Sequence, residues 1–185
     1  MSIIKEDEAE EKGIVEVAQL MLVSAKTAPK AGGIGDILSA IVSGKEKDDL
    51  ALEMEKVAEE RSVPNFKRDA MNVRDSNTVV LIGVRGIKSM GLDCGGCGYL
   101  SCKEFEESEK KTGRDFTGPN CIFKLLDLGI ALGSAVKTAA ILNVDNRIMY
   151  RIGTAAKRLN LLPEASIIMG IPLSSKSKSV YFDRK

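Results

Sequence analysis

The 185-residue sequence contains no histidine and no tryptophan, and aromatic residues make up only 4% of it. Without histidine, the chain has no Ser–His–Asp or Cys–His catalytic group and no histidine-ligated zinc site. The scarcity of aromatic side chains also argues against stacking platforms for nucleic-acid bases. Proton chemistry in this chain therefore depends on carboxylates, lysine, tyrosine, cysteine or a bound cofactor.

An excess of charge of one sign is also lacking, because 27 lysines and arginines balance 26 aspartates and glutamates. A chain balanced in this way lacks the strongly basic surface that binds nucleic acid, and we expect no nucleic-acid partner. Its apolar runs are interrupted by charges, and its N-terminal region is acidic, unlike that of a signal peptide. We therefore expect a cytoplasmic protein that does not enter the membrane.

The hydrophobic pattern predicts an α+β chain in which long buried helices pack on a small sheet. Helices are expected at residues 4–26, 48–61, 99–111, 119–142 and 146–160, and strands at residues 78–84 and 166–171. Residues 36–42 fit either a helix or a strand, whereas residues 27–35 are rich in proline and glycine and predict a loop. The Ser/Lys-rich tail from residue 174 is expected to be a solvated end or an arm crossing a dimer partner, with a phosphate or partner site as the alternative.

The four cysteines of the sequence are Cys94, Cys97, Cys102 and Cys121, spaced Cys-x2-Cys-x4-Cys with 18 residues before the last one. Three thiolates from one tight loop and a fourth from a distant segment are a common ligand set for an iron–sulfur cluster. Glycines in the loop allow positive φ angles and turn backbone N–H groups toward the sulfurs. In a reducing compartment this cluster of cysteines favours metal over disulfides, and it predicts one [4Fe–4S] cluster.

The last cysteine lies at the start of a predicted helix, because Pro119 suits a first helical turn. A thiolate of Cys121 would face the positive end of the helix dipole, which stabilises its negative charge. A zinc ion on the same four cysteines is the main alternative, although zinc ribbons usually contain two separate Cys-x2-Cys pairs. A chain without metal is the other alternative.

The cysteine segment resembles a known small domain. The run Cys-Gly-Gly-Cys-Gly-Tyr-Leu-Ser-Cys at residues 94–102, with Phe105 after it and Pro-Asn-Cys at residues 119–121, is similar to a four-cysteine iron–sulfur domain. That domain occurs in electron-transport complex B subunits and in corrinoid iron–sulfur proteins. The resemblance covers about residues 90–125, and it implies a [4Fe–4S] cluster on the four matching cysteines.

The rest of the chain resembles flavin-dependent nitroreductases. Residues 28–35, Ala-Pro-Lys-Ala-Gly-Gly-Ile-Gly, are similar to the Ala-Pro-Ser-Ala-Gly-Asn loop of that family. Residues 127–142 resemble its central buried helix, and residues 152–172 resemble its closing helix and strand. The resemblance implies one nitroreductase-like α+β domain over residues 1–185, with an iron–sulfur module inserted at residues 88–122. The whole chain also resembles a family of uncharacterised prokaryotic proteins labelled ferredoxin-domain-containing.

The nitroreductase resemblance further implies a flavin and a homodimer. By position, the FMN contacts would be Lys30, Gly32, Gly33 and Arg184. The early Arg-Ser-x-Arg phosphate contact of the family has no match here, and Gly33 replaces the asparagine of its loop; the alternative is an ordinary loop and a solvated tail arginine. The apolar faces of residues 14–23 and 119–142 are expected in the core and also fit the dimer interface that such folds generally use.

These observations predict an iron–sulfur redox protein that passes single electrons, coupled to a flavin oxidoreductase reaction and served by a redox partner protein. No residue is assigned as a catalytic acid or base, and Tyr99 is expected to pack over the cluster and exclude water. The alternative is a non-catalytic redox-sensing or partner-binding protein whose cluster, or zinc, is structural. A third interpretation, a helper in one-carbon or corrinoid chemistry, depends only on the resemblance of the cysteine segment.

Overall fold

The computed structural model describes residues 3–182. Its helices are α1 (Glu6–Thr27), α2 (Gly44–Arg61), α3 (Pro64–Arg74), α4 (Cys102–Glu107), α5 (Ile122–Ile141) and α6 (Tyr150–Arg158), with a 3₁₀ turn η1 (Ala31–Gly33). Its strands are β1 (Ile37–Val42), β2 (Thr78–Val84), β3 (Lys111–Thr112), β4 (Thr117–Gly118), β5 (Asp145–Asn146) and β6 (Ile167–Ser174).

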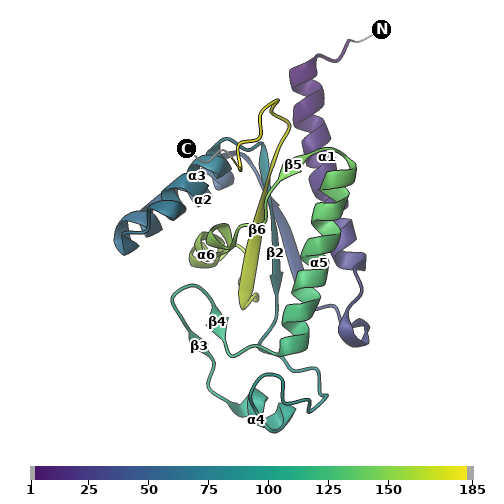
Figure 1. Ribbon diagram of the computed structural model, residues 1–185, viewed down its shortest axis with the longest axis vertical. Coiled ribbons are helices and arrows are strands. Elements are labelled where there is room, and N and C mark those ends of the chain that lie inside the picture. The colour runs from purple at the N-terminus through teal and green to yellow at the C-terminus, as the bar shows by residue number, and fades with distance from the viewer. Residues whose placement is uncertain (1–2, 183–185) are drawn as a thin grey trace.

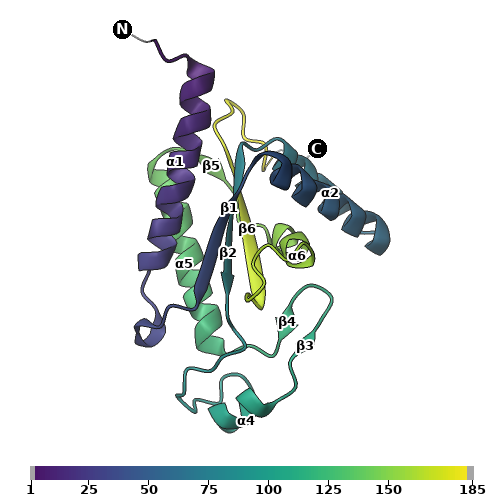
Figure 2. The same cartoon turned by 180° about the vertical axis from the view of Figure 1, so that it is seen from behind.

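An antiparallel sheet with the strand order β1-β2-β6-β5 forms the middle layer. Helices α1 and α5 cover one face of the sheet, and α2, α3 and α6 lie on the other face (Figures 1 and 2). Strands β3 and β4 form a separate hairpin, which lies with α4 beyond one end of the main sheet (Figure 1). The chain is therefore a three-layer α+β structure with a small extension at one end.

The central strand β2 joins the two cores because it is buried on both faces. Val79 and Leu81 point into the core beneath α2, α3 and α6, whereas Val80 and Ile82 point into the core beneath α1 and α5. Side chains of a strand alternate between the two faces of the sheet, so a fully buried strand needs apolar residues at both phases. The β-branched run predicted as a strand at residues 78–84 meets this requirement, and that prediction is confirmed.

Most predicted elements are confirmed, and the misses are local. The ambiguous segment 36–42 is strand β1, and the helix expected at residues 99–111 is the shorter α4 followed by a strand. Helix α3 was not predicted, although Pro64 begins it and Phe66, Ala70 and Val73 form its buried face. Its remaining residues are largely charged or polar, which weakened the periodic signal.

Helix α1 buries less than its composition suggested. Only Ile14, Ala18, Met21 and Ala25 are buried, at a spacing that defines one narrow face. Val15, Leu20 and Val23, which were expected in the core, are exposed. They lie on the side of the helix away from the sheet, because α5 and the sheet together cover only the inner face.

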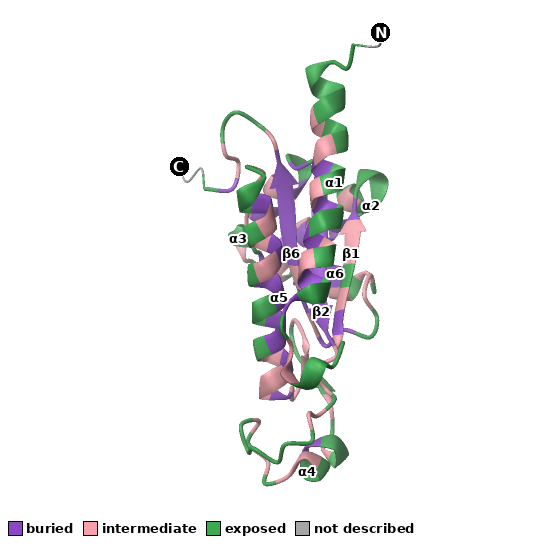
Figure 3. Ribbon diagram, turned by 90° about the vertical axis from the view of Figure 1, so that its right-hand side faces the viewer, coloured by how far each residue is buried: buried purple, intermediate pink, exposed green. Residues whose placement is uncertain are grey.

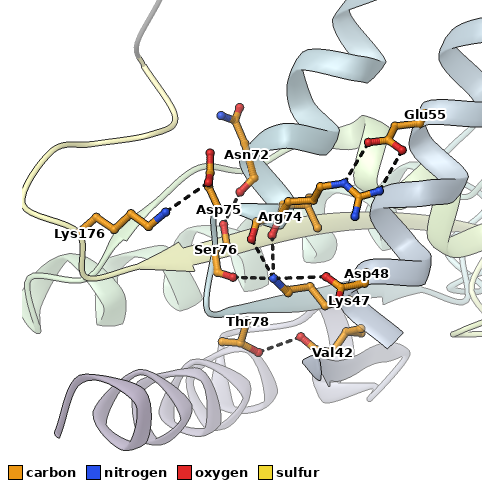
Figure 4. Close-up of polar contacts among 11 residues, drawn as sticks. Val42, Lys47, Asp48, Glu55, Asn72, Arg74, Asp75, Ser76, Thr78 and Lys176 are labelled. Carbon is orange, nitrogen blue, oxygen red and sulfur yellow. Dashed lines mark hydrogen bonds and ion pairs between the residues drawn. The ribbon is translucent and has the colours of Figure 1, made fainter. Parts of the chain in front are cut away.

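Lys47 of α2 caps the end of α3, as Figure 4 shows. Its ammonium donates to the backbone carbonyl oxygens of Val73, Arg74 and Ser76 at distances of 3.4, 3.0 and 2.9 Å. The last carbonyl groups of a helix have no partner within the helix, and a lysine there also faces the negative end of the helix dipole. This contact fixes the corner from which β2 begins.

Residues 180–182 of the C-terminal tail fold back onto this same corner, whereas residues 176–178 are exposed, as expected of a solvated end. Tyr181 is buried, and its hydroxyl lies 2.8 Å from Ser76 Oγ. Asn72 donates to the carbonyl of Val180, and Arg147 donates to the carbonyl of Tyr181. Burial raises the pKa of the Tyr181 hydroxyl, because the ionised form would lose its hydration. The tail through residue 182 is therefore held by its own chain.

The extension between β2 and α5 has few buried residues (Figure 3). Phe105 is its one fully buried side chain among residues 87–120. The hairpin is tied to the body through Asp115, whose carboxylate lies 2.5 Å from Arg61 Nη1 and accepts a hydrogen bond from Thr154. Because its core is so small, this segment depends on such polar contacts with the rest of the chain. A bound cluster would add a further link to the rest of the chain.

Candidate functional site: a four-cysteine centre beside a glycine-rich loop

Three structural elements supply the four cysteines. Cys94 and Cys97 lie in the loop that follows β2, Cys102 is the first residue of α4, and Cys121 immediately precedes α5. All of these segments lie at the end of the sheet where β2 finishes (Figure 2). The fold thus brings the distant fourth cysteine to the same end as the first three.

The loop around the first two cysteines depends on glycine. Gly95 and Gly98 have φ angles of +69° and +89°, which side chains with a Cβ rarely adopt. The N–H of Gly98 donates to the carbonyl of Gly95 over 2.9 Å, which closes a tight turn around Cys97. This is the wrapped loop that the sequence predicted.

Asp93 holds the third cysteine against this loop by two hydrogen bonds. Its backbone N–H donates to Cys102 Sγ over 3.3 Å, and its carboxylate accepts the N–H of Cys102 over 2.6 Å. An N–H group directed at a sulfur stabilises the thiolate form and helps to tune a metal bound to it. Asp93 was not predicted as a site residue, although it directly precedes the first cysteine in the sequence.

Cys121 occupies a buried position at the start of α5. Its N–H donates to the carbonyl of Gly86 over 2.8 Å, and only 5% of the residue is exposed. A Cβ at Gly96 would lie 2.6 Å from Ile122 Cγ2 and 3.7 Å from Cys94 Sγ. The cysteine loop therefore packs directly on the first turn of α5, next to Cys121.

The donor set fits an iron–sulfur cluster. Exposure falls from Cys94, which is exposed, through Cys97 and Cys102 to the buried Cys121. Within residues 3–182, no three histidine, cysteine, aspartate or glutamate side chains are close enough to hold one metal ion. The donor set consists of four thiols, and four thiolates are the usual ligands of a cubane cluster and also bind zinc.

Lys30 lies in the loop that was expected to contact FMN, but its ammonium makes hydrogen bonds to the protein backbone. Its ammonium donates to the carbonyl oxygens of Ala25, Lys26 and Ala28 at distances of 3.0, 2.8 and 2.7 Å, and so caps α1. Burial lowers the pKa of Lys30, and Asp127 acts in the opposite direction. Its charge is thus directed at the end of α1.

The backbone of the same loop remains open. Gly32 and Gly33 have φ angles of +59° and +66°, and a Cβ at Gly33 would contact nothing within 4 Å. Ala31 N donates to the Asp127 carboxylate of α5 over 2.9 Å, which fixes the loop at this end of the sheet. A Cβ at Gly32 would lie 3.4 Å from Met90 Cε, so the loop adjoins the segment that leads to Cys94.

The fourth expected flavin contact, Arg184, lies outside the described residues. Tyr181 is bonded to Ser76, which precedes β2, whereas the glycine loop precedes β1. Because β1 and β2 are antiparallel, these two points lie at opposite ends of the sheet. They are separated by the length of a seven-residue strand, roughly 20 Å. The structure places the glycine loop next to Met90, in the segment that leads to Cys94, and places residues 180–182 at the far end.

A buried ion pair near Cys121 was also missed. Lys124 and Asp127 are the two charges in the otherwise apolar first half of α5, and both are buried. Lys124 Nζ lies 2.5 Å from Asp36 Oδ2 in the segment before β1. Two charged residues three positions apart in an otherwise apolar helix are a sequence signal that buried polar partners face the helix at that point.

Comparison with known proteins shows the family of this chain. Residues 117–184 match a family described as "Uncharacterized protein containing a ferredoxin domain (DUF2148)". An uncharacterized protein from Archaeoglobus fulgidus is 46% identical over 182 residues, which cover 98% of this chain and 97% of that protein. The chain belongs to this ferredoxin-domain family, as its sequence predicted.

Solved structures show the fold. Nitroreductase CinD from Lactococcus lactis, in complex with nicotinic acid, is similar with a TM-score of 0.57 and 16% identity, over 96% of this chain and 82% of that one. A nitroreductase with bound FMN from Desulfitobacterium hafniense is similar with a TM-score of 0.56 and 12% identity, over 96% and 82%. The predicted nitroreductase-like α+β fold is confirmed, and the family and fold together suggest a redox role. No helix among residues 3–182 is long and apolar enough to cross a membrane.

Proposed function

We propose that this protein is an iron–sulfur redox protein that holds one [4Fe–4S] cluster on Cys94, Cys97, Cys102 and Cys121. The observation that carries the proposal is the packing of the cysteine loop on α5, which brings four thiols from three elements to one end of the sheet. Such a cluster accepts and releases single electrons. Residues 88–122 then act as the iron–sulfur module of a single nitroreductase-like domain.

The chain's own residues define how the cluster would be held. Asp93 directs its N–H to the sulfur of Cys102, and α5 presents its N-terminal end at Cys121. Both contributions favour negative charge on the sulfurs. The buried Cys121 and the exposed Cys94 give the centre an inner and an outer side, so a redox partner protein would exchange electrons at the Cys94 side.

We also propose FMN as a second cofactor, bound at the loop of Lys30, Gly32 and Gly33, with Arg184 as the remaining expected contact. The support is the open backbone of Gly33 and the fold shared with a nitroreductase that binds FMN. A flavin supplies the exchange between one-electron and two-electron chemistry. The contact between Gly32 and Met90 would place it beside the cysteine segment. The enzyme would then be a flavin and iron–sulfur oxidoreductase of the cytoplasm, where thiols stay reduced.

The direct test is to purify the protein without oxygen and to measure iron, acid-labile sulfide, zinc and flavin. We expect about four irons and four sulfides per chain, together with FMN released by acid. One zinc and no sulfide would overturn the cluster. If the protein holds a complete cluster but no flavin, even after incubation with FMN, the proposed role as an electron carrier stands and the proposed flavin site is overturned.

A second candidate function is a redox sensor in which the cluster performs no turnover. The observation that favours it is the exposure of Cys94 in a segment with almost no core of its own. Oxidant would then reach the cluster, and its loss would loosen residues 88–122. A cluster that survives repeated reduction and oxidation would favour the electron carrier, whereas loss of the cluster with a change of shape would favour the sensor.

We further propose a homodimer formed through the outer faces of α1 and α5. These faces expose apolar side chains along both helices, namely Val15, Leu20, Val23, Leu126, Ile130 and Ile141. Gly129 and Gly133 leave open space on α5, which permits close approach of another helix. Contiguous exposed apolar surface of this kind commonly marks an interface.

The proposed dimer predicts that a charge introduced on these apolar faces weakens dimerisation. Ile130→Glu is expected to weaken dimerisation by at least about tenfold, because a carboxylate would be buried against apolar side chains. Met71→Glu, at an exposed position of α3, is the matched control and is expected to leave the dimer intact. Sedimentation equilibrium of the loaded protein measures both. A wild-type chain that stays monomeric at micromolar concentration would contradict the proposal.

A further inference from the structure

A buried ion pair joins α5 to the segment before β1. Lys124 is 1% exposed, and its ammonium lies 2.5 Å from Asp36 Oδ2, without the angle of a hydrogen bond. No hydrogen-bond partner for this ammonium exists among residues 3–182. Arg85 lies 4.0 Å from the other oxygen of Asp36, but its strong partner is Glu164 at 2.7 Å. The Lys124 ammonium therefore has one ionic contact and unused hydrogen-bonding capacity.

The position of this lysine conflicts with the local rules of helix stability. Lys124 is the third residue of α5, where the helix dipole disfavours a positive charge. Removing a charge from water also costs several kcal/mol, roughly, and a single ion pair often fails to repay it. A well-packed apolar side chain would stabilise this site at least as well. Conflicts of this kind tend to occur at functional sites.

The ion pair lies beside the fourth cysteine. Cys121 is the residue directly before α5 and Lys124 lies in the first turn of that helix, and both are buried. The carbonyl of Asp36 accepts the N–H of Arg85, and the carbonyl of Gly86 accepts the N–H of Cys121. Adjacent residues of one short segment thus bond to the aspartate and to the cysteine.

We propose that Lys124 is a positioning residue that raises the reduction potential of the cluster, while Asp36 holds its ammonium in place and offsets part of its charge. This inference depends on the proposed four-cysteine cluster. On reduction, one electron from an external donor enters the cluster and adds one negative charge, and no bond is formed or broken. The buried ammonium stabilises that added charge through a medium that screens it weakly.

Redox titration of the loaded protein tests this inference, with the cluster's visible absorbance as the readout. Lys124→Met is expected to lower the potential, because it removes a positive charge that stabilises the reduced cluster. We expect a change on the order of tenfold in the equilibrium constant for reduction. Asp36→Asn is expected to raise the potential. Lys124→Arg keeps the charge and is expected to retain the wild-type value.

Lys137→Met, at an exposed position later on α5, is the matched control and should leave the potential unchanged. If Lys124→Met and Asp36→Asn both have the wild-type potential, the inference is overturned, but the proposed cluster is not. If Lys124→Met does not load with iron, Asp36→Asn alone decides, and an unchanged potential there overturns it. Wild-type protein without iron and sulfide would instead overturn the proposed cluster, and this inference with it.

Discussion

Replacing Cys121 by alanine is expected to reduce bound iron and sulfide from about four each per chain to less than about one. Cys121 is the buried member of the set, and it lies directly before Ile122, on which the cysteine loop packs. Without it, the remaining three thiols lie on the extension alone, next to solvent. Iron and sulfide analysis after anaerobic reconstitution measures the change.

The same substitution is expected to loosen residues 88–121. Phe105 supplies almost the whole core of this segment, so the free energy of cluster binding is also free energy of local folding. Limited proteolysis should cut the variant within this segment, while the sheet and its helices remain intact. Leu100→Ala is the matched control, because Leu100 is 91% exposed in the same loop and carries no thiol. A Cys121→Ala protein with full iron and sulfide would refute the ligand assignment.

Replacing Gly153 by alanine is expected to lower the free energy of unfolding by at least about 3 kcal/mol. Gly153 lies in α6, and a Cβ there would come within 1.7 Å of the carbonyl oxygen of Ile168 in β6. That atom belongs to the backbone of an inner strand and cannot move aside as a flexible side chain would. The reciprocal contact is also tight, because a Cβ at Gly170 would lie 2.1 Å from Ile152 Cγ2. Helix α6 therefore rests on β6 through glycine on both sides.

Gly13→Ala in α1 is the matched control, since a Cβ there would meet nothing within 4 Å. Alanine favours the helix over glycine by about 1 kcal/mol, so this variant is expected to gain up to that amount. Chemical denaturation followed by circular dichroism compares the two variants. Equal stabilities would show that the spacing between α6 and β6 relaxes without cost, against the packing described above.

Much of the fold could be predicted from the sequence because its main elements have regular apolar patterns. The buried strand at residues 78–84 and the long helix near residues 119–142 each carry a continuous apolar pattern, and both are confirmed as β2 and α5. Helix α3 and the β3–β4 hairpin were missed, since one is highly charged and the other has strands of only two residues. For elements this polar or this short, tertiary contacts outweigh local propensity.

The candidate ligands were also named by the sequence, because thiolate chemistry and spacing restrict what four cysteines can bind. The flavin contacts were drawn from a loop and a tail far apart in the chain. The structure places the glycine loop beside Met90 but holds residues 180–182 at the other end of the sheet. No sequence pattern reports that separation, since it follows from the antiparallel pairing of β1 and β2.

By itself, the sequence determined the set of four cysteines, the class of fold and the absence of histidine chemistry. These depend on residue identity and spacing, which are local properties of the chain. Only the tertiary structure decided that the cysteine loop packs on Ile122, that Asp93 donates a hydrogen bond to Cys102, and that Lys124 meets Asp36 in the interior. Such contacts join residues that are far apart in the chain or in different elements, so they depend on how the layers pack and not on any local pattern in the sequence.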